Sequence, residues 1–148
     1  MKILIFGGRD FFDVTVSTIV LDKAFQRFKL PFNDKESVLF IHGDADGADT
    51  TLKRVAEHNG FKSKAYPALW DDLDAKPCRI KYNRFGKPYN ALAGMNRNTI
   101  MVNECDIAIG VWDGMSTGTA DSRNKLRAAQ KPTLMFDYDG NLIEEFYL

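Results

Sequence analysis

The stretch DIAIGVWDGMSTGTADS, residues 106–122, decides the fold that the sequence predicts. Its apolar run at residues 107–111 contains β-branched residues and predicts a central parallel strand covered on both faces. A glycine-rich turn follows, and a helix starts at about Thr117. The free N–H groups of a helix start and the positive end of the helix dipole favour an anion.

This turn supplies two glycines and three hydroxyl groups beside the predicted helix start. A capped turn without any ligand explains the same residues, because Ser and Thr are common N-caps. The ligand hypothesis places a phosphate at the helix start and either Trp112 or Trp70 over a base. The ligand-binding candidates in this stretch are Trp112, Asp113, Gly114, Ser116, Thr117, Gly118 and Thr119.

A second informative stretch, HGDADGAD at residues 42–49, follows the predicted strand at residues 38–42. Carboxylates in a first helical turn favour the helix dipole, which explains one or two of them. The competing interpretation is a polar ligand or hydrated cation at Asp44, Asp46 or Asp49. The spacing does not fit an EF-hand loop, so we predict no metal site and identify no cofactor, and a divalent cation stays an open alternative.

The ends of the first two predicted strands carry further candidates. Residues 2–6 end in Gly7, Gly8, Arg9 and Asp10, at the strand end where open α/β sheets bind ligands. The pattern is not GxGxxG, which disfavours a standard NAD site. His42 and Gly43 end the second strand, where we interpret His42 as hydrogen-bonding a neighbouring loop rather than as a general base.

The remaining elements follow in alternation along the chain. Four helices are predicted: one at about 13–28, one that starts in the aspartate-rich stretch and ends at about 59, one that starts at 93, and one at 117–129. Further strands are predicted at 64–66, 133–136 and 142–147. This order predicts an α/β fold: one domain over residues 1–148, with a doubly wound, mainly parallel, five-stranded sheet and a short extra C-terminal strand.

A long loop insertion is predicted at about 68–92, where periodicity is lost. Its interleaved aromatic and basic residues suit stacking on bases and pairing with phosphates, and a solvated excursion explains them equally well. The helix after it carries Arg97 and Asn98 near its start. An arginine there opposes the helix dipole and indicates a bound anion, although a plain surface arginine is an alternative.

Composition limits the partners. The 148 residues include 20 basic and 20 acidic side chains, so no global positive field attracts nucleic acid, and only a local groove remains open for it. No apolar run is long enough to span a bilayer, and the N-terminal run breaks too early for a signal peptide, so we expect a cytoplasmic protein and no membrane partner. Cys78 and Cys105 lack ligand spacing and are interpreted as structural.

Four blocks in order resemble one known superfamily. They are GGRDF at 7–11, HGDADGAD at 42–49, AGMNRN at 93–98 and WDGMSTGT at 112–119. Together they resemble the SLOG superfamily, and within it the YspA-like branch called YAcAr, which is found in bacteria and their phages. The resemblance implies a Rossmann-like fold that binds a nucleotide or nucleotide-derived ligand, and a homo-oligomer is expected.

The chain also resembles the LOG branch, whose enzymes hydrolyse the N-glycosidic bond of nucleoside monophosphates. On that alignment Arg97 matches the catalytic arginine, and Gly118 with Thr119 match the phosphate-binding Gly-Thr. The catalytic glutamate falls on Ser122, while Asp121 lies one residue earlier and points elsewhere on a helix.

The sequence therefore predicts binding of a nucleoside phosphate or ADP-ribose-like ligand at the carboxyl ends of the strands. If the protein is an enzyme, the predicted reaction is hydrolysis of an N-glycosidic bond, in which a carboxylate stabilises the oxocarbenium-like sugar. The catalytic candidates are Asp44, Asp46, Arg97 and Asp121. The alternatives are a non-catalytic nucleotide sensor or sponge, and a single-stranded DNA-binding module similar to DprA.

Overall fold

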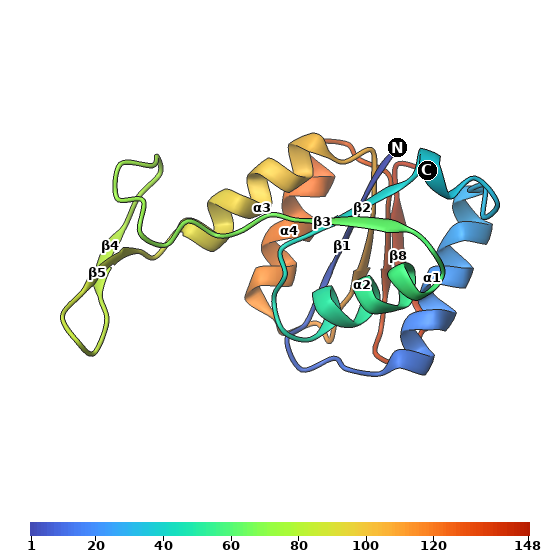
Figure 1. Cartoon of the computed structure of the whole chain (residues 1–148), viewed down its shortest axis with the longest axis horizontal. Helices are drawn as coiled ribbons and strands as arrows, with labels where there is room; N and C mark the ends of the chain where they lie inside the picture. The colour runs from blue at the N-terminus through green and yellow to red at the C-terminus, as the bar shows by residue number, and fades with distance from the viewer.

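A computed structural model describes residues 1–148 and contains a central sheet of six strands in the order β3-β2-β1-β6-β7-β8 (Figure 1). Neighbouring strands pair in parallel except for β8, which is antiparallel to β7. The strands are β1 Lys2–Gly7, β2 Leu39–His42, β3 Lys62–Ala65, β6 Ile107–Val111, β7 Thr133–Phe136 and β8 Leu142–Phe146. The predicted α/β fold is confirmed, with five parallel strands and one short C-terminal strand.

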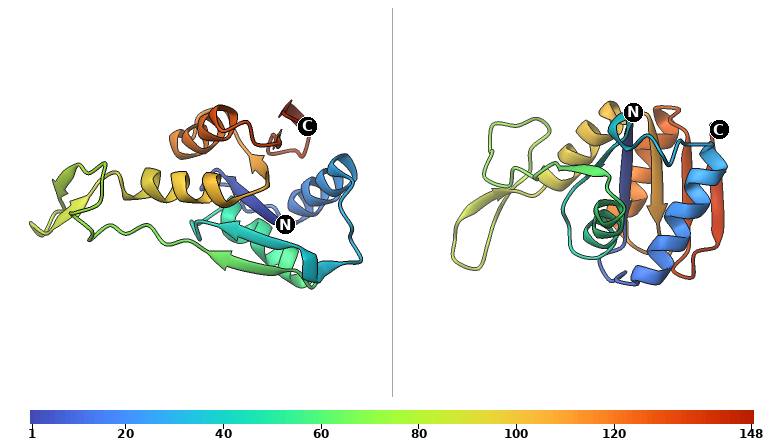
Figure 2. Two further views of the ribbon diagram at one scale, coloured as in Figure 1. Left: turned by 90° about the horizontal axis from the view of Figure 1, so that it is seen from above. Right: turned by 45° about the vertical axis from the view of Figure 1, so that its right-hand side comes forward.

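Four helices cover the two faces of this sheet. They are α1 Val14–Phe28, α2 Ala48–His58, α3 Ala93–Glu104 and α4 Thr117–Ala128, with a short 3-10 helix η1 at Lys35–Ser37. Helices α1 and α2 pack together on one face, and α3 and α4 on the other (Figure 2). None of the helices combines the length and the apolar character that a membrane span requires.

The central strand β1 is buried on both faces because its side chains alternate between two cores. Ile3 and Ile5 belong to the apolar cluster under α1 and α2, whereas Leu4 and Phe6 belong to the cluster under α3 and α4. Its neighbour β6 is buried throughout. A strand with two covered faces reads as a continuous apolar run, which is why both strands could be recognised in the sequence.

The connections create a crevice at the carboxyl ends of β1 and β6. From β1 the chain moves outward to β2 and β3, and it then returns through α3 to β6 on the opposite side of β1. Ligands of open α/β sheets bind at such a switch point.

A projecting arm, residues 67–92, connects β3 to α3 and extends away from the sheet (Figure 1). The sequence predicted a loop without regular structure here, but the arm carries a two-stranded antiparallel hairpin, β4 Ile80–Tyr82 and β5 Pro88–Asn90. Each of these strands has three residues, which is too short for an alternating pattern to be recognised.

Candidate functional site

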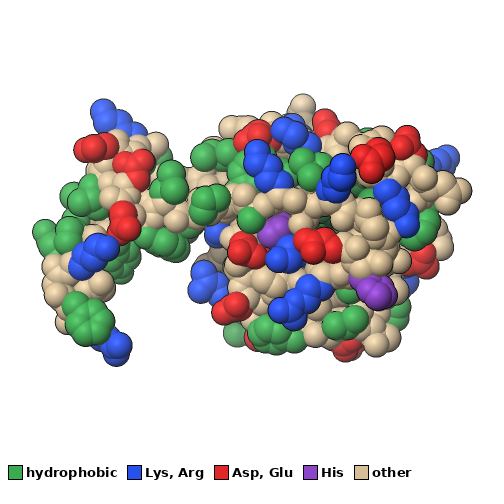
Figure 3. All heavy atoms as spheres, in the orientation of Figure 1, with side chains coloured by type: hydrophobic (Ala, Val, Ile, Leu, Met, Phe, Trp, Pro, Cys, Tyr) green, Lys and Arg blue, Asp and Glu red, His purple; other side chains and the backbone are tan.

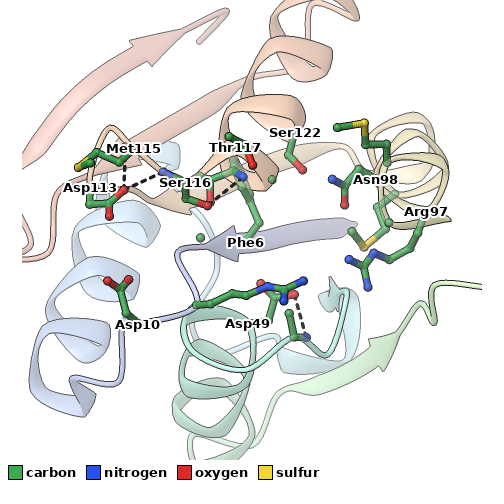
Figure 4. A pocket seen from close by; sticks show the side chains of 18 of the residues that line it. Phe6, Asp10, Asp49, Arg97, Asn98, Asp113, Met115, Ser116, Thr117 and Ser122 are labelled. Carbon is green, nitrogen blue, oxygen red and sulfur yellow. Dashed lines mark hydrogen bonds between the residues drawn. The ribbon is translucent and has the colours of Figure 1, made fainter. Parts of the chain in front are cut away.

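A cleft of about 720 Å³ opens at the carboxyl ends of β1 and β6 (Figure 4). This volume falls within the range of about 300–1,000 Å³ that is typical of small-molecule sites. Side chains from the end of β1, the start of α2, α3 and the start of α4 line it. The candidates from the sequence that line this cleft are Gly7, Arg9, Asp10, Arg97, Asn98, Asp113, Ser116, Thr117, Gly118 and Thr119.

The start of α4 is capped by its own residues. The Ser116 hydroxyl oxygen accepts hydrogen bonds from the Thr119 amide at 3.4 Å and from the Thr119 hydroxyl at 3.0 Å. The Asp113 carboxylate accepts from the amides of Met115 and Ser116 at 2.8 and 3.0 Å, and these bonds lower the pKa of Asp113. Of the four amides from Ser116 to Thr119, those of Ser116 and Thr119 are therefore already engaged.

Two amides at this helix start remain free, those of Thr117 and Gly118, because the first N–H groups of a helix have no intrahelical acceptor. Gly118 lines the cleft, and a Cβ added to it would meet no protein atom within 4 Å. Its φ also lies outside the left-handed region that requires glycine. Neither packing nor backbone conformation within the chain explains a glycine at this position.

Arg97 reaches from α3 across the cleft to the loop after β2. Its Nη1 donates to the Gly43 carbonyl at 2.8 Å, and its buried Nε has no hydrogen-bond partner. A Cβ on Gly43 would lie 2.7 Å from the guanidinium carbon, so Gly43 makes room for this side chain. Burial lowers the pKa of Arg97, nearby Asp49 raises it, and nearby Arg9 lowers it.

The cleft therefore contains two guanidinium groups, those of Arg9 and Arg97, and neither forms a salt bridge. At the other end of the cleft lie the carboxylates of Asp10 and Asp113 (Figure 4). Asp49, a buried carboxylate, also lines the cleft near Arg97. Two guanidinium groups at one end and two carboxylates at the other suit a ligand that is anionic at one end and rich in hydroxyl or amine groups at the other.

Asp49 shapes the wall of the cleft. Its buried carboxylate accepts from the amides of Gly43 at 2.9 Å and Ala45 at 3.4 Å, so it fixes the loop between β2 and α2. Burial raises the pKa of Asp49 to about 6, although the two amides and Arg97 act in the opposite direction. The Asp49 carboxylate therefore already has hydrogen-bond donors within the protein, the backbone amides of this loop.

Asp44 and Asp46 lie outside the helix that the sequence predicted them to open, because α2 begins only at Ala48. They line an adjoining hollow of about 410 Å³ that shares Arg9, Trp70 and Arg97 with the cleft. Asp44 has a φ of 55°, and its carboxylate is 3.7 Å from the Lys53 ammonium. No group of three or more His, Cys, Asp or Glu side chains is placed to hold a metal ion.

His42 is buried at the end of β2, outside the cleft. Its Nδ1 accepts a hydrogen bond from the Asp44 amide at 3.0 Å. Burial lowers the pKa of His42, and the Lys53 charge lowers it further. A neutral imidazole that holds the following loop agrees with the interpretation of His42 as a strand-end residue.

Four other candidates have partners elsewhere or lie apart from the cleft. The Trp112 indole N–H donates to the Ser116 carbonyl at 3.1 Å, and Trp70 from the arm lines the cleft instead. Asp121 accepts from Asn98 Nδ2 at 3.1 Å and from Lys125 Nζ at 2.8 Å, while Ser122 lines the cleft. The remaining two are Gly8, whose Cβ position is occupied by the Tyr138 hydroxyl, and Gly114, which borders open space.

Tyr138 was not among the residues predicted from the sequence, and its hydroxyl donates a hydrogen bond to Asp10. Burial raises the pKa of Tyr138, and the bond to Asp10 raises it further. Tyr138 follows β7, a parallel strand, so its position at the end of a strand was the available signal. It holds Asp10 at the acidic end of the cleft.

Comparison with known families supports the resemblance found in the sequence. The profile of YAcAr, described as the "YspA, cpYpsA-related SLOG family", matches residues 1–72. The resemblance to YAcAr is confirmed. The YAcAr match contains β1, β2 and β3 with the GGRDF and HGDADGAD blocks, while Arg97 and the start of α4 lie beyond it.

Solved structures support the same fold. DprA from Streptococcus pneumoniae has a TM-score of 0.61 and 16% identity over 91% of this chain and 50% of its own. DprA from Helicobacter pylori, in a structure titled for its single-stranded DNA binding mode, has a TM-score of 0.60 and 17% identity over 92% of this chain and 65% of its own. TM1055 has a TM-score of 0.54 and 17% identity over 89% of this chain and 71% of its own.

The YAcAr-like chain thus spans half the length of the Streptococcus pneumoniae DprA chain. At these identities the likeness shows the fold alone. No curated protein sequence matches the chain.

Proposed function

We propose that the cleft binds a nucleoside phosphate or an ADP-ribose-like ligand. The observation that carries this proposal is Arg97, a half-buried guanidinium that faces the cleft, forms no salt bridge and has an unpartnered buried Nε. An unsatisfied buried donor is costly, particularly on a charged group. A phosphate oxygen offers the acceptor that Nε lacks and a negative charge in direct contact with the guanidinium.

The phosphate is proposed to lie between the two arginines and the start of α4. The free amides of Thr117 and Gly118 are donors there, and the missing side chain of Gly118 lets the ligand approach the backbone. The sugar and base would extend toward Asp10, which can accept hydrogen bonds from ribose hydroxyls, and Trp70 offers a ring for the base. The cleft volume accommodates a ligand of this size.

Isothermal titration calorimetry tests the binding proposal with AMP, ADP-ribose, ribose 5-phosphate and adenosine as probes. We expect the phosphorylated ligands to bind and adenosine to bind at least roughly tenfold more weakly, because it lacks the charge-assisted hydrogen bonds. Arg97→Gln should weaken AMP binding by a similar factor, while Arg54→Gln, on the exposed face of α2, should not. Equal binding of AMP by both variants would contradict the proposal.

The hydrolase and the sensor forms of the proposal differ in whether the free base is released. A hydrolase would add water across the N-glycosidic bond, with a carboxylate stabilising the developing oxocarbenium ion. Asp46 borders the cleft from the adjoining hollow, whereas Asp121 is engaged by Lys125 and the LOG glutamate position holds Ser122. The serine at this position favours the sensor form.

Chromatographic detection of free base after incubation with nucleoside monophosphates, ADP-ribose and NAD distinguishes the two forms. In the hydrolase form, Asp46→Asn abolishes turnover and keeps the dissociation constant within roughly tenfold. In the sensor form, ligands bind in calorimetry and no base accumulates with the wild-type protein.

A further inference from the structure

The outer part of the arm, residues 76–92, carries a concentration of positive charge, whereas the first part, residues 67–75, contains the three aspartates Asp71, Asp72 and Asp74. Residues 76–92 contain five basic side chains and no acidic one, in a chain whose formal net charge is zero. The remainder of the chain therefore has an excess of five acidic residues. The basic residues are Lys76, Arg79, Lys81, Arg84 and Lys87. Figure 3 shows the arm extending well away from the acidic and basic side chains on the main body.

Large apolar side chains on this arm are exposed to solvent. Tyr82 is 68% exposed, and Phe85, at the tip of the hairpin, is 80% exposed. The turn that presents Phe85 is ordered by Asn83, whose side-chain oxygen accepts from the amides of Phe85 at 2.9 Å and Lys87 at 3.0 Å. Gly86 completes the turn with a φ of 78°. The ring is thus held out in the solvent by a structured turn.

The arm's cations are largely free to meet another molecule. Lys87 forms an ion pair with Asp71 at 3.4 Å, in which both side chains are mostly exposed, and such pairs contribute little. The Arg84 guanidinium lies 4.8 Å from the centroid of the Phe85 ring. In the hairpin register Lys81 is opposite Tyr89, so these two side chains share one face. Phe85 and Tyr89 therefore each have a cation on their side of the hairpin.

We propose that the arm is a binding surface for single-stranded nucleic acid. A polynucleotide alternates phosphates with bases, and the arm alternates cations with exposed rings in Lys81-Tyr82 and Arg84-Phe85. The cations neutralise phosphates, and the rings stack on bases. In a duplex the bases are already stacked on one another, so exposed rings favour the single strand.

A second copy of the chain fits the arm less well than a polynucleotide. Protein interfaces bury a core of adjoining apolar residues and deplete it of charge. On the hairpin, Ile80 and Tyr82 are exposed apolar side chains of one strand face. Lys81 and Arg84 flank Tyr82 and Phe85 in the sequence, so charge lies among the exposed apolar side chains. The interleaved pattern therefore favours the nucleic acid, and arm-mediated self-association becomes the outcome that would overturn the proposal.

Fluorescence anisotropy with labelled 20-nucleotide single strands of DNA and RNA, and with a duplex of the same length, tests the proposal on the full chain. The charge variant is Lys81→Ala with Arg84→Ala and Lys87→Ala, and the ring variant is Tyr82→Ala with Phe85→Ala. The matched control removes three exposed cations from the body by Arg54→Ala, Lys62→Ala and Lys64→Ala.

The wild-type protein should prefer single strands to the duplex, with affinity that falls as salt rises. The charge variant should reduce the slope of log affinity against log salt by about 2, and the ring variant should weaken binding by roughly fivefold or more per ring. The body control should behave as wild type. AMP binding in the cleft should be unchanged in all three variants, which separates a failure here from a failure of the proposed function.

Two results would overturn the proposal. One is that the charge and ring variants bind oligonucleotides as tightly as the body control does, or that the wild-type protein does not bind them even at low salt. The other is a dimer in size-exclusion chromatography that the ring variant converts to monomer without changing oligonucleotide binding, which would make the arm an interface between copies.

Discussion

At the scale of single residues, a substitution at Gly118 should affect ligand binding and folding stability in opposite directions. A Cβ there meets no protein atom, and the backbone does not need glycine. Gly118→Ala should therefore increase the free energy of unfolding by about 0.5–1 kcal/mol in urea denaturation, because alanine loses less conformational freedom on folding. The same methyl group enters the cleft and should weaken AMP binding in calorimetry.

Gly114→Ala provides the matched control for that prediction. Gly114 also borders open space, but its φ is 82°, a conformation that strains any residue with a side chain. This variant should lose stability, by about 1 kcal/mol. If Gly118→Ala gained stability and bound AMP as tightly as wild type, the ligand would not approach the start of α4.

Asp49 gives the fold a pH dependence of known sign. Burial raises its pKa to about 6, so its contribution to stability is complete below about pH 4 and is lost as the pH rises through about 6. Asp49→Asn keeps an oxygen for the amides of Gly43 and Ala45 but cannot ionise. Relative to this variant, the wild-type free energy of unfolding should fall by up to about 3 kcal/mol between pH 4 and 7.

Urea denaturation at unit steps of pH measures this difference. Asp22→Asn, which removes an exposed carboxylate from α1, controls for the change in net charge. Parallel curves for wild type and Asp49→Asn would show that Asp49 does not titrate in this window.

At the same scale, residue type predicted much of the cleft but not which groups are already engaged. Glycines and charged residues at strand ends pointed correctly to one edge of the sheet, where Arg9, Arg97 and Gly118 meet. The sequence could not show that Asp113 bonds the amides after it, or that Asp121 pairs with Lys125. Those facts depend on side-chain directions that composition and spacing leave undetermined.

At the scale of elements, the buried strands and the amphipathic helices were predictable because each follows a strong periodic pattern. Strand β6 and strand β7 match the prediction at both ends, since a strand covered on both faces is a short apolar run between polar turns. The hairpin of the arm was missed because its strands contact no core. Its order comes from hydrogen bonds, which leave no hydrophobic pattern in the sequence.

Asn90 is the residue that orders the base of the arm. It is fully buried, its side-chain oxygen accepts from the amides of Arg79 at 3.2 Å and Leu92 at 3.0 Å, and its Nδ2 donates to the Asp72 carbonyl at 3.4 Å. Asn90→Ala leaves those two amides without a partner. We expect trypsin to cleave the arm several-fold faster, while the melting temperature of the main body changes little.

Limited proteolysis followed by mass spectrometry measures the site and rate of cleavage in that variant. Asn103→Ala, at an exposed position on α3, is the matched control. Cleavage that remains at the wild-type rate in Asn90→Ala would mean that the hairpin pairing alone holds the arm.

At the scale of the whole molecule, the fold places the cleft and the hairpin tip in separate regions. The cleft lies at the switch point of the sheet and is lined by β1, α2, α3, α4 and Trp70 from the base of the arm, whereas the hairpin tip stands outside both cores. Groups that share no partner and lie far apart contribute additively to stability and binding. Substitutions in the cleft should therefore leave binding at the hairpin tip unchanged, and substitutions at the hairpin tip should leave binding in the cleft unchanged.

Shortening the hairpin tests that independence without disturbing either core. Replacing residues 83–87 by Asn-Gly joins Tyr82 to Pro88 through a two-residue turn and removes Arg84, Phe85 and Lys87. Because none of the removed side chains contributes to a core, the melting temperature should stay within about 2 °C of wild type. AMP should bind as before in calorimetry, and anisotropy should show single-strand binding weakened by roughly tenfold or more. Loss of AMP binding in this variant would mean that the arm and the cleft form one site, and the separation drawn from the fold would be wrong.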